Sequence, residues 1–330
     1  MKKLTKIMLL VAAMAMVFAF TSCGNDESKE QTDAADGDIS IGIVQLVTHD
    51  ALDSANKGFV DALADNDYVD GKNITIDQQN AQADQSNLTT IAQRFVNNDV
   101  DLILAIATGA AQAAAAETSD IPILGTAITD YEAARLVESN DAPGGNVSGT
   151  TDMNPIKEQI ELLQQLVPDA KNVGIVYNSS EDNSVLQADE AKKALQDAGM
   201  TVEEGTVTSS NDVQQVITSI ASKVDAIYLP TDNTLASSMA IVSEVAKAQK
   251  LPVICGESNM VMEGGLATLG IDYYKLGYQT GEMAVRILKG EATPAEMPIE
   301  SQTEFTYTIN GETAEAIGIT IPEELSQYVK

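Results

Sequence analysis

The chain has 330 residues, and its 49 Asp and Glu residues outnumber its 19 Lys and Arg residues, giving a formal net charge of −30. Nucleic-acid binding needs a basic surface, so this composition argues against a nucleic-acid partner. We interpret the acidity as a source of solubility, and the chain is long enough for two domains of ordinary size.

The N-terminal segment has the layout of a secretion signal. Lys2, Lys3 and Lys6 precede an apolar stretch, and Thr21 and Ser22 stand directly before Cys23. We therefore expect residues 1–22 to be a signal peptide. A cysteine at this place resembles the bacterial lipobox, in which the thiol is acylated, whereas an ordinary signal peptide with an incidental cysteine is the alternative. The polar residues 24–38 are typical of a flexible tether, which we take as 23–38.

The first half of the folded body alternates apolar strands with amphipathic helices. The predicted strands are 40–47, 74–76, 102–106 and 121–124. The predicted helices are 54–64, 85–97 and an Ala-rich helix after residue 109, with a loop and helix cap at 48–53. Residues 102–106 lack polar alternation, which is typical of a strand buried on both faces of a parallel sheet. Ligands bind at the carboxyl ends of such strands, so 108–111 is a candidate ligand cradle.

The second half repeats the order of the first. Residues 224–240 follow the pattern of 100–117, with Thr108 opposite Asp232 and Gly109 opposite Asn233. Segment 265–272 likewise corresponds to 145–152, each opening a helix. The predicted strands are 172–178, 201–207, the apolar run after 224, and 252–254. The predicted helices are 155–166, 186–198, 212–222 and 274–288.

This repeat predicts an α/β fold of two doubly wound parallel-sheet lobes joined by three crossover strands. We expect lobe 1 to contain 39–150 plus about 272–303, and lobe 2 to contain 151–271 plus about 304–330. The carboxyl edges of the two sheets then face one another across a cleft, as in a hinge-bending binding protein.

Catalytic and metal motifs are missing from the sequence. His49 is the one histidine, and we find no metal-spaced Cys/His set, nucleophile elbow, phosphate loop or dinucleotide fingerprint. Cys255 is expected to be a small buried hydrophobe, because it lies in an apolar strand. We therefore predict no catalytic residue, no metal and no cofactor, although a hydrolase or transferase remains an alternative.

Hydroxyl, amide and carboxylate groups gather in the loops that follow the predicted strands. Such residues cap helices, which is one reading of each loop. Together they suit a small zwitterion, since helix N-termini accept a carboxylate and Asp232 would pair with an ammonium group. A sugar, a nucleoside or another small solute remains an alternative ligand.

Several of these motifs together resemble a known family. They are 49–53 with 57–59, 107–112, 129–130, 177–184, 230–234 and 270–274. From about residue 39 to the C-terminus the chain resembles the ABC-transporter substrate-binding proteins of the tryptophan/tyrosine-type family, which have the type I periplasmic-binding-protein fold. Proline is usual in that family where this chain has Asp50, Gly109, Tyr131 and Ser179. The resemblance implies capture of an amino acid, aromatic in the best-known members, for delivery to a membrane permease.

On this hypothesis the protein is an extracytoplasmic monomer, lipid-anchored through Cys23, that works with an ABC permease. The carboxylate of the ligand is held by Thr108, Ala110, Ala111, Asn183 and Ser184. The ammonium group is held by Asp232, with Asp130 as a second candidate. Asn233 is a further predicted ligand-binding residue. The side-chain end is lined by Thr48, His49, Glu257 and Tyr273. A transcription regulator of similar fold is opposed by the signal segment.

Overall fold

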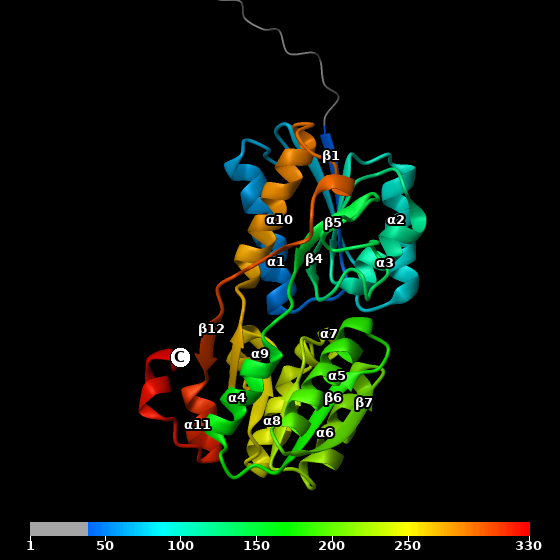
Figure 1. The fold of residues 1–330 in the computed structure, drawn as a ribbon. Helices are drawn as coiled ribbons and strands as arrows, with labels where there is room; N and C mark the ends of the chain where they lie inside the picture. The colour runs from blue at the N-terminus through cyan, green and yellow to red at the C-terminus, as the bar shows by residue number, and fades with distance from the viewer. Residues whose placement is uncertain (1–38) are drawn as a thin grey trace, which may run out of the picture. The chain divides into compact units, whose positions relative to one another are not determined.

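The computed structural model describes residues 39–330, so the predicted signal peptide, Cys23 and the tether lie outside the described residues. The described chain forms two lobes, each built on a six-stranded sheet with helices on both faces (Figure 1). The predicted α/β class with two doubly wound lobes is confirmed.

The sheet of lobe 1 has the strand order β11-β5-β4-β3-β1-β2, and all its pairings are parallel. Its strands are β1 (Ile39–Gln45), β2 (Ile74–Asn80), β3 (Leu102–Ile106), β4 (Ile123–Ile128), β5 (Val147–Thr151) and β11 (Glu300–Ser301). Its helices are α1 (Asp50–Asp65), α2 (Gln85–Asn97), α3 (Thr108–Glu117) and α10 (Tyr273–Leu288), with a 3₁₀ turn at Pro294–Glu296. Helices α1 and α10 cover one face, and α2 and α3 cover the other.

The sheet of lobe 2 has the order β12-β10-β9-β8-β6-β7. Its strands are β6 (Asn172–Asn178), β7 (Thr201–Val207), β8 (Ala226–Leu229), β9 (Val253–Cys255), β10 (Ala267–Gly270) and β12 (Thr306–Ile309). Its helices are α4 (Ile156–Leu166), α5 (Asp182–Asp197), α6 (Val213–Ala221), α7 (Asn233–Ala236), α8 (Met239–Gln249), α9 (Ser258–Met262) and α11 (Gly311–Ile317), with 3₁₀ turns at Ser210–Asp212 and Glu323–Tyr328. Strand β12 pairs antiparallel with β10, so one edge departs from the parallel pattern.

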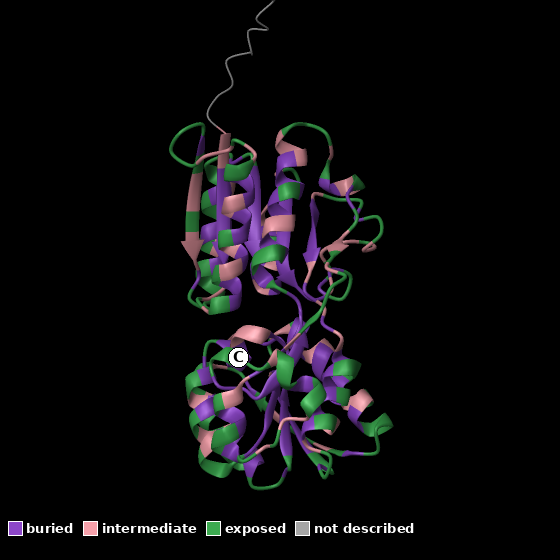
Figure 2. Cartoon of the chain, turned by 90° about the vertical axis from the view of Figure 1, so that its left-hand side faces the viewer, coloured by how far each residue is buried: buried purple, intermediate pink, exposed green. Residues whose placement is uncertain are grey.

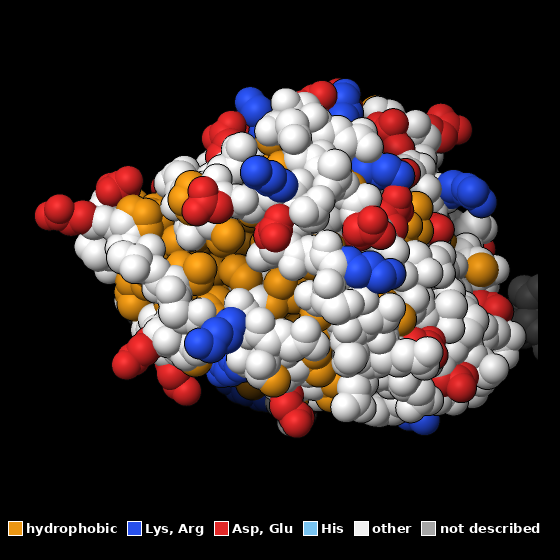
Figure 3. Space-filling view, turned by 90° about the horizontal axis from the view of Figure 1, so that it is seen from below, with side chains coloured by type: hydrophobic (Ala, Val, Ile, Leu, Met, Phe, Trp, Pro, Cys, Tyr) orange, Lys and Arg blue, Asp and Glu red, His pale blue; other side chains and the backbone are white. Residues whose placement is uncertain are grey.

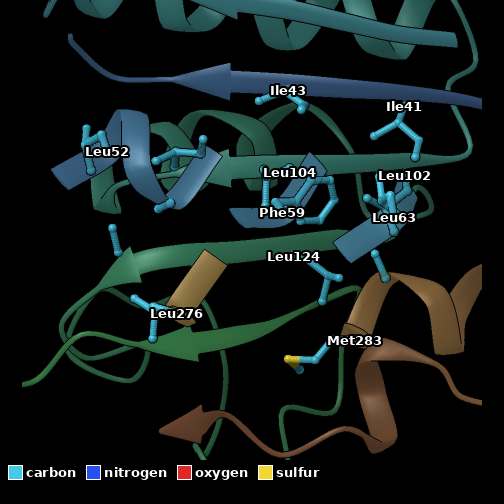
Figure 4. Packing of buried hydrophobic residues seen from close by; sticks show 14 of the residues in the cluster. Ile41, Ile43, Leu52, Phe59, Leu63, Leu102, Leu104, Leu124, Leu276 and Met283 are labelled. Carbon is cyan, nitrogen blue, oxygen red and sulfur yellow. The ribbon is translucent and has the colours of Figure 1, made fainter. Parts of the chain in front are cut away.

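The buried strand β3 shows how the sequence pattern builds the core. Leu102 and Leu104 belong to the cluster that contains Phe59 of α1, whereas Ile103 and Ala105 belong to the cluster under α2 and α3. Successive side chains of a strand point to opposite faces, so an uninterrupted apolar run fills both layers. Figure 4 shows the first of these layers, and Figure 2 shows that the central strands of both sheets are buried whereas edge strands are partly exposed.

Helix α10 is fixed to lobe 1 by close packing against α1. A Cβ atom on Gly277 would lie 1.8 Å from the carbonyl oxygen of Ala55, and one on Gly58 would lie 2.1 Å from that of Tyr274. Only glycine permits the two helices to approach this closely. This contact brings a segment from late in the sequence onto the first lobe.

Several elements are longer than the sequence pattern predicts. Helix α1 begins at Asp50 and not at residue 54, because Ala51 and Leu52 are buried in the core of lobe 1. Helix α5 likewise begins at Asp182 and not at 186. Strand β2 continues to Asn80, and the helix start predicted near residue 233 divides into the short α7 and the longer α8.

The chain passes between the lobes three times: after β5, after β10, and between β11 and β12. The first two crossings are tied together, because the backbone N–H of Ile271 donates to Oδ1 of Asn154 at 3.0 Å.

The surface and the helix lengths bear on possible partners. On the face visible in Figure 3, Lys and Arg side chains are interspersed with Asp and Glu, and they form no continuous basic stripe there. Within residues 39–330, no helix is both long enough and apolar enough to span a bilayer.

Candidate functional site

A small cavity of about 20 Å³ lies between the two lobes, at the carboxyl ends of their strands. It is lined by His49, Ala51, Leu52, Ala127, Asp152, Asn183, Thr231, Asp232, Asn233, Glu257 and Tyr273. Lobe 1 supplies residues from the start of α1, from β4 and from α10. Lobe 2 supplies the starts of α5 and α7 and the loops that follow β8 and β9. The first crossing contributes Asp152.

The ionisable side chains that line this cavity are mainly acidic. Asp152, Asp232 and Glu257 are 5%, 2% and 2% exposed, and no Lys or Arg is among the lining residues. Burial disfavours the charged form of a carboxyl group. It raises the pKa of Asp232 to about 7, with a further contribution from the charge of Glu181, and it raises the pKa of Glu257 to about 7. A cation that entered this cavity would therefore be favourably paired.

Two of the three carboxyl groups also cap short helices. Asp232 accepts hydrogen bonds from the backbone N–H groups of Asn178 (2.6 Å) and Leu235 (2.8 Å), and it precedes α7. Glu257 accepts from the N–H groups of Asn259 (2.6 Å) and Met260 (2.7 Å) at the start of α9. These N–H groups compensate part of each negative charge.

Asp152 has a different environment, because its side-chain partners are two hydroxyl groups. Tyr273 donates to Oδ2 at 2.7 Å, and Thr129 donates to Oδ1 at 3.0 Å. Burial raises the pKa of Asp152, and these hydrogen bonds oppose the shift. Unlike Asp232 and Glu257, Asp152 caps no helix. Its compensation thus comes from the Tyr273 and Thr129 hydroxyl groups and its own backbone N–H, and not from a helix N-terminus.

His49 reaches across the cleft to the other lobe. Its Nε2 lies 3.3 Å from Oδ1 of Asn233. Burial lowers the pKa of His49, and this effect exceeds the opposing influence of the Asn233 hydrogen bond and of nearby carboxylates. A neutral imidazole that donates to the Asn233 oxygen fits this geometry.

The start of α3 offers hydrogen-bond donors on the lobe 1 side. The hydroxyl group of Thr108 is buried, and it has no hydrogen-bond partner among the described residues. Ala107, just before it, has a φ of +83°, which is strained for a residue with a Cβ atom. Thr108 borders an interlobe groove of about 520 Å³ that shares Asn183 and Asn233 with the small cavity. A polar ligand atom in this groove would give the Thr108 hydroxyl the partner that it lacks.

The structure brings some of the predicted site residues together and separates others. Those that line the small cavity are His49, Asn183, Asp232, Asn233, Glu257 and Tyr273, and Thr108 lines the adjoining groove. Those that line neither are Thr48, Ala110, Ala111, Asp130 and Ser184. Ala110 and Ala111 are packed in the core under α3, and Ser184 hydrogen-bonds Asp232. Asp130 accepts from the backbone N–H of Ala133 at 2.7 Å.

Sequence reasoning did not select Asp152, Thr231, Ala51, Leu52 or Ala127 as site residues. The repeat did pair Asp152 with Asp272, but the two have different environments in the structure. Asp152 is buried in the cleft, whereas Asp272 is exposed and accepts from the N–H of Lys275 at the start of α10. A search for carboxylates on the crossings would have found Asp152, although it would not have separated the two residues.

Comparisons with known proteins agree on the type of protein. Residues 40–330 match the family model described as ABC transporter substrate binding protein. A tyrosine-binding protein of Clostridioides difficile is 44% identical, and the match covers 98% of this chain and 95% of that protein. The ABC domain from Streptococcus pneumoniae, crystallised in complex with L-Trp, is 41% identical with a TM-score of 0.86 and covers 89% of this chain and all of that one.

A third relative bears on the arrangement of the lobes. A substrate-binding protein with adhesive properties from Clostridium difficile, in its ligand-free, open structure, is 46% identical over 88% of this chain and 98% of that one. Its TM-score is 0.68, lower than that of the L-Trp complex although its sequence identity is higher. The lobes of this chain are thus arranged more like those of the complex than like those of the open structure.

The raised pKa values predict a pH-dependent stability. A carboxyl group whose pKa is about 7 when folded, against about 4.3 for a free Glu, stabilises the fold fully below pH ~4, and this contribution is lost as the pH rises through 7. Between pH 5 and pH 8 the free energy of unfolding of the wild type should therefore fall. The Glu257→Gln variant lacks this titrating group, so its free energy of unfolding should fall by about 2 kcal/mol less over the same range.

Urea denaturation of the ligand-free protein at several pH values measures this difference. Glu203→Gln, at an exposed carboxyl group of β7, is the matched control and should follow the wild-type pH dependence. Parallel curves for the wild type and Glu257→Gln would show that Glu257 titrates in its ordinary range.

Proposed function

The chain belongs to the ABC transporter substrate binding protein family, and we propose from this premise that it captures a free amino acid between its two lobes for import. The observation that carries the proposal is the buried interlobe cavity, which has three carboxyl groups and no Lys or Arg in its lining. An α-ammonium group supplies the positive charge that this lining lacks.

Asp152 is the proposed principal partner of the ligand ammonium group, with Asp232 and Glu257 close to it. Its two oxygens already accept hydrogen bonds from Tyr273 and Thr129, which fix the direction of the carboxyl group without neutralising it. An ammonium group would complete its coordination and lower its pKa. The sequence alone predicts Asp232 as the main partner of the ammonium group, and the structure favours Asp152 for this role.

The carboxylate of the ligand is proposed to lie at the start of α3. The unpartnered hydroxyl group of Thr108 and the N-terminal end of this helix favour an anionic group there. Asn183 borders both the groove and the cavity, so its amide is within the same region. Ala110 and Ala111 are not assigned a ligand contact, because their side chains are packed in the core and their backbone N–H groups already donate to the carbonyl oxygen of Ala107.

An aromatic amino acid is the proposed ligand class. The named ligands of two relatives, tyrosine and L-Trp, support this class. Leu52, Ala127 and the ring of Tyr273 give the cavity an apolar side. A volume of about 20 Å³ is far below the 300–1,000 Å³ of ordinary ligand sites, so the lobes must part to admit such a ligand.

The proposed motion is a rotation of lobe 1 (39–150 plus about 272–303) against lobe 2 (151–271 plus about 304–330). The three crossings would act as the hinge, because few residues there need to change backbone angles. Ligand contacts from both lobes would favour the closed arrangement.

No catalytic activity is proposed. The ring of His49 pairs with the amide of Asn233 and not with a hydroxyl or thiol nucleophile, so a hydrolase or transferase has no support from this contact. Among residues 39–330, no cluster of three or more His, Cys, Asp or Glu side chains has an arrangement that could hold a metal ion.

We also propose that the protein is an extracytoplasmic monomer, anchored by lipid on Cys23, that delivers its ligand to an ABC permease. Acylation of the thiol would hold the folded body at the membrane through the polar tether. Fractionation of cells that express Cys23→Ser should find the folded body away from the membrane fraction. An unchanged membrane association of that variant would contradict the anchor.

Isothermal titration calorimetry of the folded body tests the ligand assignment. L-tyrosine, L-tryptophan and L-leucine represent amino acids, and D-ribose and adenosine represent the sugar and nucleoside alternatives. Asp152→Asn should weaken amino-acid binding roughly 30- to 1,000-fold, because truncating one partner of a buried charge pair costs about 2–4 kcal/mol.

Two controls accompany this titration. Asp189→Asn makes the same change at an exposed position of α5 and should retain wild-type affinity. 3-(4-Hydroxyphenyl)propanoate, which is tyrosine without its ammonium group, should not bind the wild type. Binding of this analogue as tight as that of tyrosine, or full affinity in Asp152→Asn, would remove the ammonium assignment.

A further inference from the structure

Hydrogen bonds between side chains join the two lobes at several points within residues 39–330. They connect His49 with Asn233 at 3.3 Å, Gln112 with Asp182 at 2.9 Å, and Gln187 with Thr129 at 2.9 Å. The Gln187–Thr129 bond differs from the other two because both of its residues are buried. Gln187 is 0% exposed and Thr129 is 3% exposed, so water does not compete for this bond.

The orientation of the Gln187 amide is determined by its neighbours. Its Oε1 accepts a hydrogen bond from the backbone N–H of Thr231 at 3.1 Å, which identifies that atom as the oxygen. Nε2 must then supply both remaining bonds, one to the hydroxyl of Thr231 and one to that of Thr129. Both amide protons of Gln187 are therefore used, one within lobe 2 and one toward lobe 1.

The Gln187–Thr129 hydrogen bond also determines the direction of the hydrogen bond between Thr129 and Asp152. Since Thr129 accepts a proton from Gln187, its own hydroxyl proton is free to point at Oδ1 of Asp152, 3.0 Å away. Tyr273 donates to the other oxygen of the same carboxyl group. The resulting chain runs from Thr231 through Gln187 and Thr129 to Asp152, and it borders the ligand cavity at both ends.

We infer that Gln187 and Thr129 form an interlobe latch, a buried hydrogen bond that forms as the lobes close and orients Asp152 for the ligand. Gln187 lies on α5 of lobe 2, whereas Thr129 and Tyr273 belong to lobe 1. Asp152 lies on the first crossing, and its backbone N–H donates to the carbonyl oxygen of Ile128 in lobe 1 at 3.1 Å. A rotation of the lobes therefore changes the Gln187–Thr129 distance. Gln187 is thus a positioning residue, which acts through Thr129 and does not itself line the cavity.

The inference rests on the proposed function, and it gives the latch a specific energetic signature. A hydrogen bond that exists in the closed state but not in the open state contributes to ligand affinity and not to the stability of the ligand-free open protein. Its two partners must also be coupled, since removing either one removes the same bond.

A double-mutant cycle on the folded body, with L-tyrosine as the probe, tests the latch. Gln187→Met keeps the length of the side chain and removes its hydrogen bonds, and Thr129→Val replaces a hydroxyl with a methyl group. We expect Gln187→Met to weaken tyrosine binding roughly three- to tenfold in the wild-type background. In the Thr129→Val background it should weaken binding less than twofold.

Two further variants separate the latch from general loss of structure. Gln187→Leu is a second apolar replacement that lacks the donor to Thr129, so it should behave like Gln187→Met even if the latter folds poorly. Thr126→Val is the matched control, because the buried hydroxyl of Thr126 contacts Thr150 within lobe 1. Combined with Gln187→Met, it should leave the full three- to tenfold effect.

The same variants unfolded in urea without ligand supply the second readout. The changes in unfolding midpoint from Gln187→Met and Thr129→Val should add, although their effects on tyrosine affinity do not. The latch is overturned if Gln187→Met weakens binding by the same factor in both backgrounds or not at all. A wild-type protein that binds no amino acid would instead overturn the proposed function.

Discussion

Burial of three carboxyl groups without a basic side chain is the constraint on which the interlobe site depends. Asp152, Asp232 and Glu257 are almost fully buried, and burial raises the pKa of each. Uncompensated burial of charge is costly. The chain compensates Asp232 and Glu257 with helix N–H groups and leaves Asp152 to hydroxyl donors. On the proposed function, an ammonium group of the ligand supplies the positive charge that this lining lacks, and it would favour closure of the lobes around the ligand.

The two halves of the chain repeat one plan but serve the ligand differently. In lobe 1 the strand β3 leads to Thr108, an unpartnered buried hydroxyl group at the start of α3. In lobe 2 the equivalent strand β8 leads to Asp232, which is already bonded to backbone N–H groups. On the proposed function, lobe 1 would bind the ligand carboxylate and lobe 2 would contact its ammonium group. Asp152 lies on the first crossing, between the two lobes.

Much of the fold was predictable because its signals are local. The apolar run of β3 and its later copy, which forms β8, predicted the parallel sheets. The repeated order of strands and helices predicted the two lobes. The starts of α1 and α5 were less predictable, since burial of Ala51 and Leu52 extends a helix into residues with loop character. The antiparallel pairing of β12 with β10 was not predicted either. It depends on the path of the chain after the third crossing, which no local sequence pattern indicates.

The candidate site was only partly predictable, for a similar reason. Residues at strand ends, such as His49 and Asn183, follow from topology, and they do line the cavity. Asp152 and Gln187 gain their roles from contacts between distant segments, which spacing along the chain does not reveal. Small-angle X-ray scattering with and without L-tyrosine tests ligand-driven closure most directly. The account predicts a smaller radius of gyration when tyrosine saturates the protein, and an unchanged radius despite measured binding would contradict it.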